Sequence, residues 1–221
     1  MKRFSLFVLL AVALAAVSCA NAYQASSELK EPVNDILLLE PVSVIEYLTD
    51  EQLVVIDDDM SRESSEMIGS FILSQPGYWH VTDDAVLMGD ATQDLVGFYN
   101  IIRAMRKKLV PTMPIPESIN EVIKASGHRY AMAVVSGGFT RSRKNYTREI
   151  VKDVAIAILS LGSVVPVSYK SAFDSAIIIF DSQTDSVVYF RQLDPVTIDP
   201  LSQPRVINYL PRLISRYDWT R

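Results

Sequence analysis

The feature that most constrains this chain is an apolar run at its start. Phe4 to Val17 follows the basic pair Lys2 and Arg3, and a single serine interrupts it. Small residues follow in the stretch 18–22. A basic start, an apolar run and small residues, in that order, are typical of an export signal. The run is shorter than the roughly 20 residues of a spanning helix, so we interpret residues 1–22 as a signal segment outside the fold.

Two cleavage positions fit this segment. Ala20-Asn21-Ala22 satisfies the small-x-small rule of ordinary signal peptidase and would leave Tyr23 first. The stretch 16–19 resembles a bacterial lipobox, although Ala16 stands where that motif usually has leucine, and cleavage there would leave a lipidated Cys19. We favour lipidation at Cys19 because it is the chain's one cysteine and it lies where the apolar run ends.

The body that follows the signal is acidic and without cysteine. Without Lys2 and Arg3 it holds 19 basic and 26 acidic residues, a formal charge of -7. This balance argues against nucleic acid, which calls for a basic patch. Disulfides and thiol chemistry are excluded, so an apolar core has to hold the fold together. The polar stretch 23–34 is expected to be a tether, and residues 35–221 are expected to form a single domain.

Apolar runs and breaker residues divide the domain into strands and helices. Strands are expected at 35–48 (where Pro41 breaks the strand or marks an edge), 78–81, 129–139, 171–181 and 186–193, and residues 53–56 are expected to form a short strand or an entry turn. Helices are expected after Asp57 (capped by Asp59 or Ser61 and stopped at Gln75), at 83–110, at 117–126 (ended by Gly127), at 148–161 and at 203–217 (kinked or broken at Pro211). This order predicts an α/β fold, a three-layer-like domain with a mixed sheet of about four to five strands and helices on both faces.

Two segments resemble a group of bacterial envelope lipoproteins. Residues 125–137 resemble its "small-Gly-x-x-Tyr, apolar strand, Gly" segment, and residues 176–189 resemble its closing hairpin, with Asp185 where the group usually has glycine. The group includes the curli-secretion channel lipoprotein, penicillin-binding-protein activator lipoproteins and the N-terminal domain of the Tol-system β-propeller protein. The resemblance covers about residues 35–195. It implies an assembly or regulatory module that binds other envelope proteins or itself and is not an enzyme.

Catalytic and metal-binding patterns are weak in this sequence. His80 and His128 are the only histidines, and Ser136 lies in a fragment of a nucleophile elbow that is more typical of a tight turn after a strand. The acidic run 57–59 lacks the alternating ligands and turn glycine of an EF-hand, so we interpret it as helix capping. Asp83-Asp84 is expected to cap the next helix in the same way. We therefore predict no catalytic residue, no metal site and no cofactor.

Basic and aromatic side chains are the remaining candidates for contacts. A basic loop follows the strand at 129–139, and it is either solvated or in contact with an acidic partner, anionic lipid or glycan phosphate. The aromatic residues are expected to pack in the core or at its rim, or to face a partner. The basic residues are Arg141, Arg143, Lys144 and Arg148, and the aromatic ones are Trp79, Tyr217 and Trp219.

These observations together predict an exported, lipid-anchored envelope protein. It would act as a scaffold or accessory subunit through contacts with envelope proteins or with its own copies. The expected location is the bacterial outer membrane, facing the periplasm, with a soluble periplasmic or secreted protein as the alternative. A glycan or small-ligand binder would need a pocket with tyrosine or tryptophan and convergent polar groups. A hydrolase of envelope polymers would need clustered carboxylates in a cleft.

The choice between the two cleavage positions is directly testable. We expect the N-terminal peptide of the protein isolated from membranes to begin at Cys19 and to carry the added mass of a lipid. Mass spectrometry of that peptide measures both properties. An unmodified peptide that begins at Tyr23 would rule out the lipid anchor.

Overall fold

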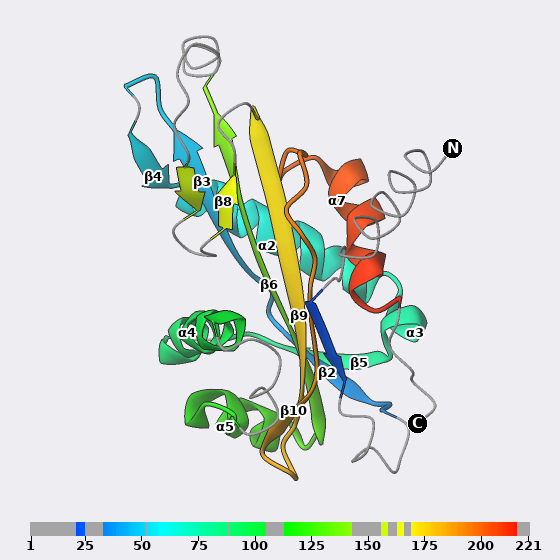
Figure 1. Ribbon diagram of the computed structural model, residues 1–221. Helices are drawn as coiled ribbons and strands as arrows, with labels where there is room; N and C mark the ends of the chain where they lie inside the picture. The colour runs from blue at the N-terminus through cyan, green and yellow to red at the C-terminus, as the bar shows by residue number, and fades with distance from the viewer. Residues whose placement is uncertain are drawn as a thin grey trace, which may run out of the picture.

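The computed structural model describes residues 21–24, 33–51, 53–87, 89–104, 113–142, 156–158, 163–165 and 169–215. Within these ranges, eight strands form one mixed sheet, flanked by helices on both faces (Figure 1). The predicted α/β fold is confirmed, and its sheet is larger than the four to five strands expected. The sheet strands are β1 (Asn21–Gln24), β2 (Ile36–Leu39), β3 (Val42–Leu48), β4 (Val54–Ile56), β5 (Val81–Ala85), β6 (Tyr130–Arg141), β9 (Ser171–Asp181) and β10 (Ser186–Gln192).

The other elements are short strands and helices. The strands β7 (Ile156–Ile158) and β8 (Ser163–Val165) form a separate two-stranded ladder. The helices are α2 (Asp58–Leu73), α3 (Pro76–Trp79), α4 (Asp90–Ala104), α5 (Glu117–Ser126), α7 (Gln203–Tyr209) and the 3₁₀ turn η2 (Leu210–Leu213).

Strand β6 is the central strand of the sheet. It pairs with β9 in antiparallel register over its length, and β10 continues the sheet on the far side of β9, with β1 at the edge. On its other side β6 pairs in parallel first with β2 and then with β3. The predicted break at Pro41 separates these two strands. The sheet therefore forks beside β6 and ends in two edges, β5 next to β2 and β4 next to β3.

The two faces of the sheet bury separate apolar cores. Alternate residues of β9 point to opposite faces, as in any strand: Ile177 and Ile179 join the core under α2, α3 and α7, whereas Ile178 and Phe180 join the core under α4 and α5. Figure 1 shows these two helix groups on opposite sides of the sheet. Because β6, β9 and β10 are covered on both faces, their sequences are continuous apolar runs and do not alternate.

Helix α2 is fixed to β3 by serine hydroxyls. Asp57 is its N-cap, and its carboxylate accepts the backbone N–H of Met60 at 2.9 Å, so the prediction of Asp59 or Ser61 as the cap is wrong. The Ser61 hydroxyl instead accepts the backbone N–H of Ile45 at 2.9 Å, and the Ser65 hydroxyl accepts that of Ser43. Strand β4 pairs only with residues 46–48 of β3. Helix α2 thus supplies hydrogen-bond acceptors for backbone N–H groups of β3 that lie before this paired part.

The C-terminal helical pair is fixed by two tyrosines. Helix α7 ends at Tyr209, and η2 begins beside Pro211, so the predicted break at this proline is confirmed. The Tyr189 hydroxyl donates to the Leu213 carbonyl at 2.6 Å, and the Tyr209 hydroxyl donates to the Asp194 carbonyl. Burial, and then the nearby Asp174 carboxylate, raise the pKa of Tyr209, so its hydroxyl keeps the proton that this bond needs.

For residues 76–85 we predicted a strand followed by the start of a helix, but the structure has a short helix followed by a strand. Pro76 is the first residue of a new helical turn, α3, which His80 ends in the left-handed region at φ 55°. The strand follows only at Val81. Asp83 and Asp84 are exposed residues within β5 and do not cap a helix, and α4 begins later, at Asp90.

The helix predicted at 148–161 is also wrong where the structure describes it. Residues 156–158 form β7, which pairs antiparallel with β8. A short apolar run rich in isoleucine and valine suits a strand as well as a buried helix, and its periodicity does not separate the two. The helix at 117–126 is confirmed, and Gly127 ends it at φ 77°.

The predicted tether begins inside the sheet. Tyr23 and Gln24 belong to β1 and pair with Phe190 and Tyr189 of β10. Val33, at the other end of the expected tether, is fully buried. None of the described helices combines the length and apolar character that crossing a membrane requires.

Close packing around Gly138 in β6 gives a stability prediction. A Cβ atom at this position would lie 2.6 Å from the backbone oxygen of Ala172, closer than real contacts allow. We expect Gly138→Ala to lower the free energy of unfolding by about 1–3 kcal/mol, as overpacked cores do. The matched control is Gly97→Ala, at an exposed position of α4 where nothing lies within 4 Å of the added Cβ atom. It should be neutral or stabilising by up to about 1 kcal/mol. Denaturant unfolding measures both, and equal effects would contradict this interpretation.

Candidate functional site

The short strand β4 presents an unusual exposed apolar edge, which we call the β4 edge (Leu53–Ile56). The exposed fractions are 56% for Leu53, 39% for Val54, 43% for Val55 and 59% for Ile56. Four consecutive large apolar side chains thus keep contact with water at the upper left of the sheet in Figure 1. Single exposed apolar residues are normal, but a contiguous group of them marks an interaction site.

Backbone geometry leaves one side of β4 open. The Leu53 carbonyl accepts the N–H of Thr49, and the Asp57 N–H donates to the Ile45 carbonyl, so odd-numbered residues bond toward β3. Alternation along a strand then directs the N–H and C=O groups of Val54 and Ile56 away from β3. Within the described part of the chain, β4 pairs with β3 alone. These outward groups can therefore bond to an added strand.

The other described edge beside β6 is protected. Strand β5 carries Asp83 and Asp84, both exposed, and charged side chains discourage strand addition. The β4 edge holds no proline, charge or bulge of the kind that natural sheets use to block their edges. Of the two described edges on this side of β6, β4 is therefore the one that is open to an extended segment of a partner.

Acidic residues lie at both ends of the β4 edge. Asp50 and Glu51 precede it in the turn from β3, and both are exposed. Asp57, Asp58 and Asp59 follow it at the start of α2. Asp57 is engaged as the N-cap, and Asp59 forms an ion pair with Arg62, which leaves Glu51 and Asp58 as the exposed charges nearest to the apolar centre. The predicted capping role of this acidic run is confirmed for Asp57.

A second polar cluster lies where β2, β5 and β6 begin, and it contains both histidines. Asp35, at φ 60°, accepts a short hydrogen bond from the Thr82 hydroxyl, and the His128 Nε2 lies 3.5 Å from the same carboxylate oxygen. The His80 Nδ1 lies 2.9 Å from the Asn34 side-chain oxygen. The sequence offered no reason to expect the two histidines at one end of the sheet.

This cluster lacks the order of a catalytic relay. In a triad, histidine stands between nucleophile and acid and uses a different ring nitrogen for each. Here Asp35 bonds Thr82 directly, and both face the same nitrogen of His128, while Nδ1 of that ring lies 3.2 Å from the Ser126 hydroxyl. Ser136 is far from it in the sheet, fully buried, with its hydroxyl 2.6 Å from that of Ser43.

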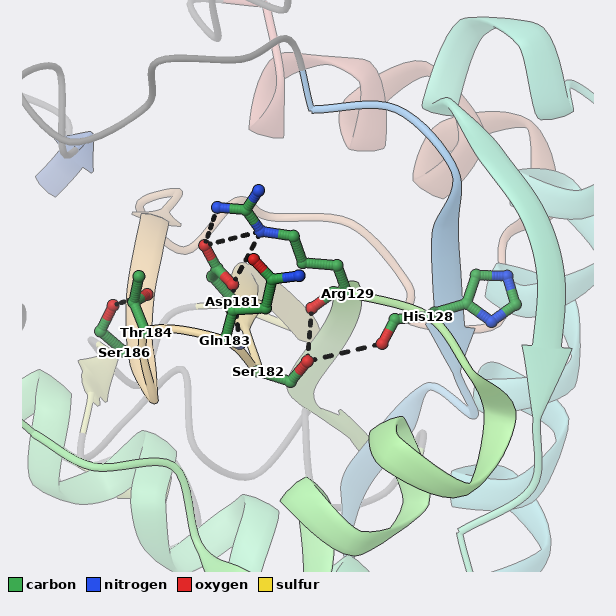
Figure 2. Close-up of polar contacts among 7 residues, drawn as sticks. All are labelled: His128, Arg129, Asp181, Ser182, Gln183, Thr184 and Ser186. Atoms are coloured by element: carbon green, nitrogen blue, oxygen red, sulfur yellow. Dashed lines mark hydrogen bonds and ion pairs between the residues drawn. The ribbon is translucent and has the colours of Figure 1, made fainter.

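Next to this cluster, an ion pair closes the β9–β10 hairpin onto the start of β6. Figure 2 shows the Arg129 guanidinium against the Asp181 carboxylate, with N–O distances of 3.1 Å and 2.8 Å for two parallel bonds. The Ser182 hydroxyl also donates to the Arg129 carbonyl, at 3.0 Å. Asp185 adopts the turn conformation at φ 49° that glycine would take. These contacts fix the hairpin. They also engage the side chains of Arg129, Asp181 and Ser182, which a ligand at this position would have to contact.

A hollow of about 520 Å³ lies between α2 and α7. Its floor includes Met67, Phe71 and Ile207, and its rim includes Glu63 and Glu66. The volume suits a small molecule. Both glutamates are exposed on α2, however, and catalytic acids of this kind are typically buried against apolar surface.

The predicted basic loop differs from expectation at its first member. Arg141 belongs to β6, is 3% exposed, and its guanidinium lies over the ring of Phe139. It cannot act as an exposed contact in this position. Arg143, Lys144 and Arg148 lie outside the described residues, as do Cys19, Tyr217 and Trp219, so their roles stay predictions. Trp79 is fully buried between Phe71 and Tyr78, which agrees with core packing and not with a partner-facing role.

The described residues contain no group of three or more histidine, cysteine or acidic side chains that could hold a metal ion. The acidic run 57–59 acts through its cap and its ion pair with Arg62. The expectation that the protein uses no metal and no cofactor stays a prediction.

Comparisons with known proteins show distant similarities of structure. No family model matches the sequence, and no curated protein matches it. A PelC dodecamer from Paraburkholderia phytofirmans matches at 8% identity and TM-score 0.39, over 89% of this chain and 96% of that one. The LpoB C-terminal domain from Salmonella enterica matches at 10% identity and TM-score 0.32, over 78% and 89%. A neuraminyllactose-binding hemagglutinin homolog from Helicobacter pylori matches at 10% identity and TM-score 0.32, over 86% and 83%.

These similarities are too low to carry an argument about function. They do not show the family to which the segments 125–137 and 176–189 point, so the resemblance to envelope lipoproteins stays a prediction.

Sequence reasoning left Leu53–Ile56 open between a short strand and an entry turn; the structure forms the strand at Val54–Ile56, but the site was missed. One signal was present: four apolar residues stand between two acidic groups, Asp50-Glu51 and Asp57-Asp58-Asp59, without proline or lysine. That pattern also fits a buried strand, and only the sheet order shows that β4 is an edge.

The Arg129–Asp181 pair gives a second stability prediction. Asp181 is 2% exposed and Arg129 29%, so Arg129→Met would leave a buried carboxylate without its partner. We expect a loss of about 2–4 kcal/mol in the free energy of unfolding, measured with denaturant. The control is Arg62→Met, which removes a pair with side chains 68% and 85% exposed and should cost less than about 1 kcal/mol. Equal losses for the two variants would show that the buried pair contributes no more to the free energy of unfolding than the exposed pair does.

Proposed function

We propose that this chain is an exported envelope protein, held at a membrane by a lipid on Cys19, that acts by binding another protein. The observation that supports it most is the β4 edge, where apolar side chains and outward backbone groups occur together. The signal-like segment and its lipobox-like end favour the bacterial outer membrane, on the periplasmic side, as its location. In this proposal the protein is a scaffold or accessory subunit and catalyses no reaction.

The type of exposed surface favours a protein partner over a small ligand. An added strand uses main-chain hydrogen bonds for affinity and alternate side chains for specificity. The β4 edge offers both at an exposed margin of the sheet. A small molecule needs a concave site that removes most of its surface from water, and this edge does not provide one.

The hollow between α2 and α7 is the observation that favours the alternative, a ligand-binding protein. It has a suitable volume and an apolar floor, but no tyrosine or tryptophan lines it, and sugars usually stack on such rings. Its two exposed glutamates would favour a cationic ligand. Binding of a ligand in this hollow would be compatible with protein binding at β4, because the two sites share no residue.

Crosslinking in intact cells tests the proposed function. A photoreactive residue at position 56, on the β4 edge, is expected to capture a discrete protein. The matched control is position 86, where Val86 is similarly exposed (65%, against 59% for Ile56) but lies after β5. Immunoblotting of the crosslinked products measures both positions. Capture at position 86 alone, or at neither position, would contradict the assignment of β4 as the contact surface.

A further inference from the structure

Resting on that proposed function, we infer that the β4 edge binds an extended apolar segment of another protein that carries basic residues at both of its ends. The segment would lie alongside β4 as an additional strand of the sheet. Three properties of the edge determine this partner: its outward backbone groups, its apolar side chains on both faces, and its acidic ends.

The backbone determines that the partner is extended. Val54 and Ile56 each direct one N–H and one C=O away from β3, at the spacing of alternate residues in a strand. Only another strand presents matching groups at this repeat. A helix satisfies its backbone internally and would leave these groups of β4 without partners.

The side chains determine that the partner is apolar on both faces. Successive side chains of a strand point to opposite faces, so Val54 and Ile56 lie on one face and Leu53 and Val55 on the other. All four are at least 39% exposed. A bound strand places its own side chains beside them on each face. A partner that alternated strictly between apolar and charged residues would cover one face only.

The acidic ends determine the charge of the partner. Glu51 precedes the apolar centre and Asp58 follows it, and both are exposed. A three-residue strand is roughly 10 Å long, close to the Debye length of about 8 Å at physiological salt. Each acidic end therefore acts mainly on the end of the bound segment that lies beside it, where it attracts a basic residue and repels an acidic one.

The same charges disfavour a second copy of this chain as the occupant. Two copies of β4 related by a twofold axis would pair antiparallel about Val55, with Val54 opposite Ile56 of the copy. That register brings the exposed Glu51 of each chain toward the end of the copy's β4 edge that carries Asp58. Like charges directly opposite each other destabilise strand pairs, and the bodies also share a net negative charge.

Peptide binding to the full chain purified in detergent tests the inference. The probe is a short fluorescent peptide of valine and threonine with a lysine at each end, and the comparison peptide carries glutamate at each end. We expect the lysine-ended peptide to bind about tenfold more tightly by fluorescence anisotropy, and this difference to shrink in high salt. Equal affinities, or a preference for the glutamate-ended peptide, would overturn the inference.

Two variants test the geometry. Val54→Pro removes an N–H that points away from β3, so β4 should stay paired with β3 and peptide binding should be lost. Val54→Ala, which keeps that N–H, is the control and should retain most of the binding. The double variant Glu51→Lys/Asp58→Lys should reverse the preference in favour of the glutamate-ended peptide. Thermal melting shows whether each variant is folded, and the charge reversal does not depend on the proline variant.

The outcomes separate this inference from the proposed function. Capture of a protein at position 56 in cells, together with no charge preference in the peptides, would leave protein binding intact and overturn the basic partner. If no protein is captured at position 56 and the peptides show no charge preference, both the proposed function and this inference are overturned. Concentration-dependent self-association that Val54→Pro abolishes, measured by sedimentation, would identify a second copy as the occupant and overturn the inference as well.

Discussion

The antiparallel ladder between β6 and β9 is the interaction on which the other elements depend. Its register joins every residue from Tyr130 to Thr140 with one from Asp181 to Ser171, and nearly all of these side chains are buried. Gly138 has no room for a side chain, because the neighbouring strand passes so close to it. The Arg129–Asp181 pair closes one end of the ladder. Both apolar cores form on its two faces, and every sheet strand attaches to β6, to β9 or to a strand that does.

The elements predicted correctly are those whose signal is local. The strands at 129–139, 171–181 and 186–193 are long apolar runs, and the helix at 117–126 has a clear stripe and a glycine at its end. Errors occurred where one pattern fits two structures. Residues 154–161 form an apolar run with a single serine, which suits a buried helix and a strand equally. At 76–81, aromatic and β-branched residues indicated a strand, but the proline favoured the first turn of a helix.

The candidate site was harder to predict because it depends on which strands are neighbours. Nothing near Leu53–Ile56 in the sequence indicates that, among the described residues, no strand pairs with its outer side. That follows from the pairing of β2 and β3 along one side of β6, which brings together residues about 90 positions apart. The prediction that Arg141 belongs to an exposed basic loop was wrong for a related reason. Strand β6 continues beyond its two glycines, so a residue expected after the strand is buried within it.

The position of β1 bears on how the molecule would stand at a membrane. Cys19 precedes Asn21, the first residue of β1, by two positions. Extended chain spans at most about 3.6 Å per residue, so a lipid on Cys19 would hold this strand within about 7 Å of its attachment point. The β1 margin of the sheet would then lie next to the bilayer, and the strand order would run outward through β10, β9 and β6 to β5 and β4. Cleavage before Tyr23 would instead remove Asn21 and Ala22, the half of β1 that pairs with Gln192 and Arg191 of β10.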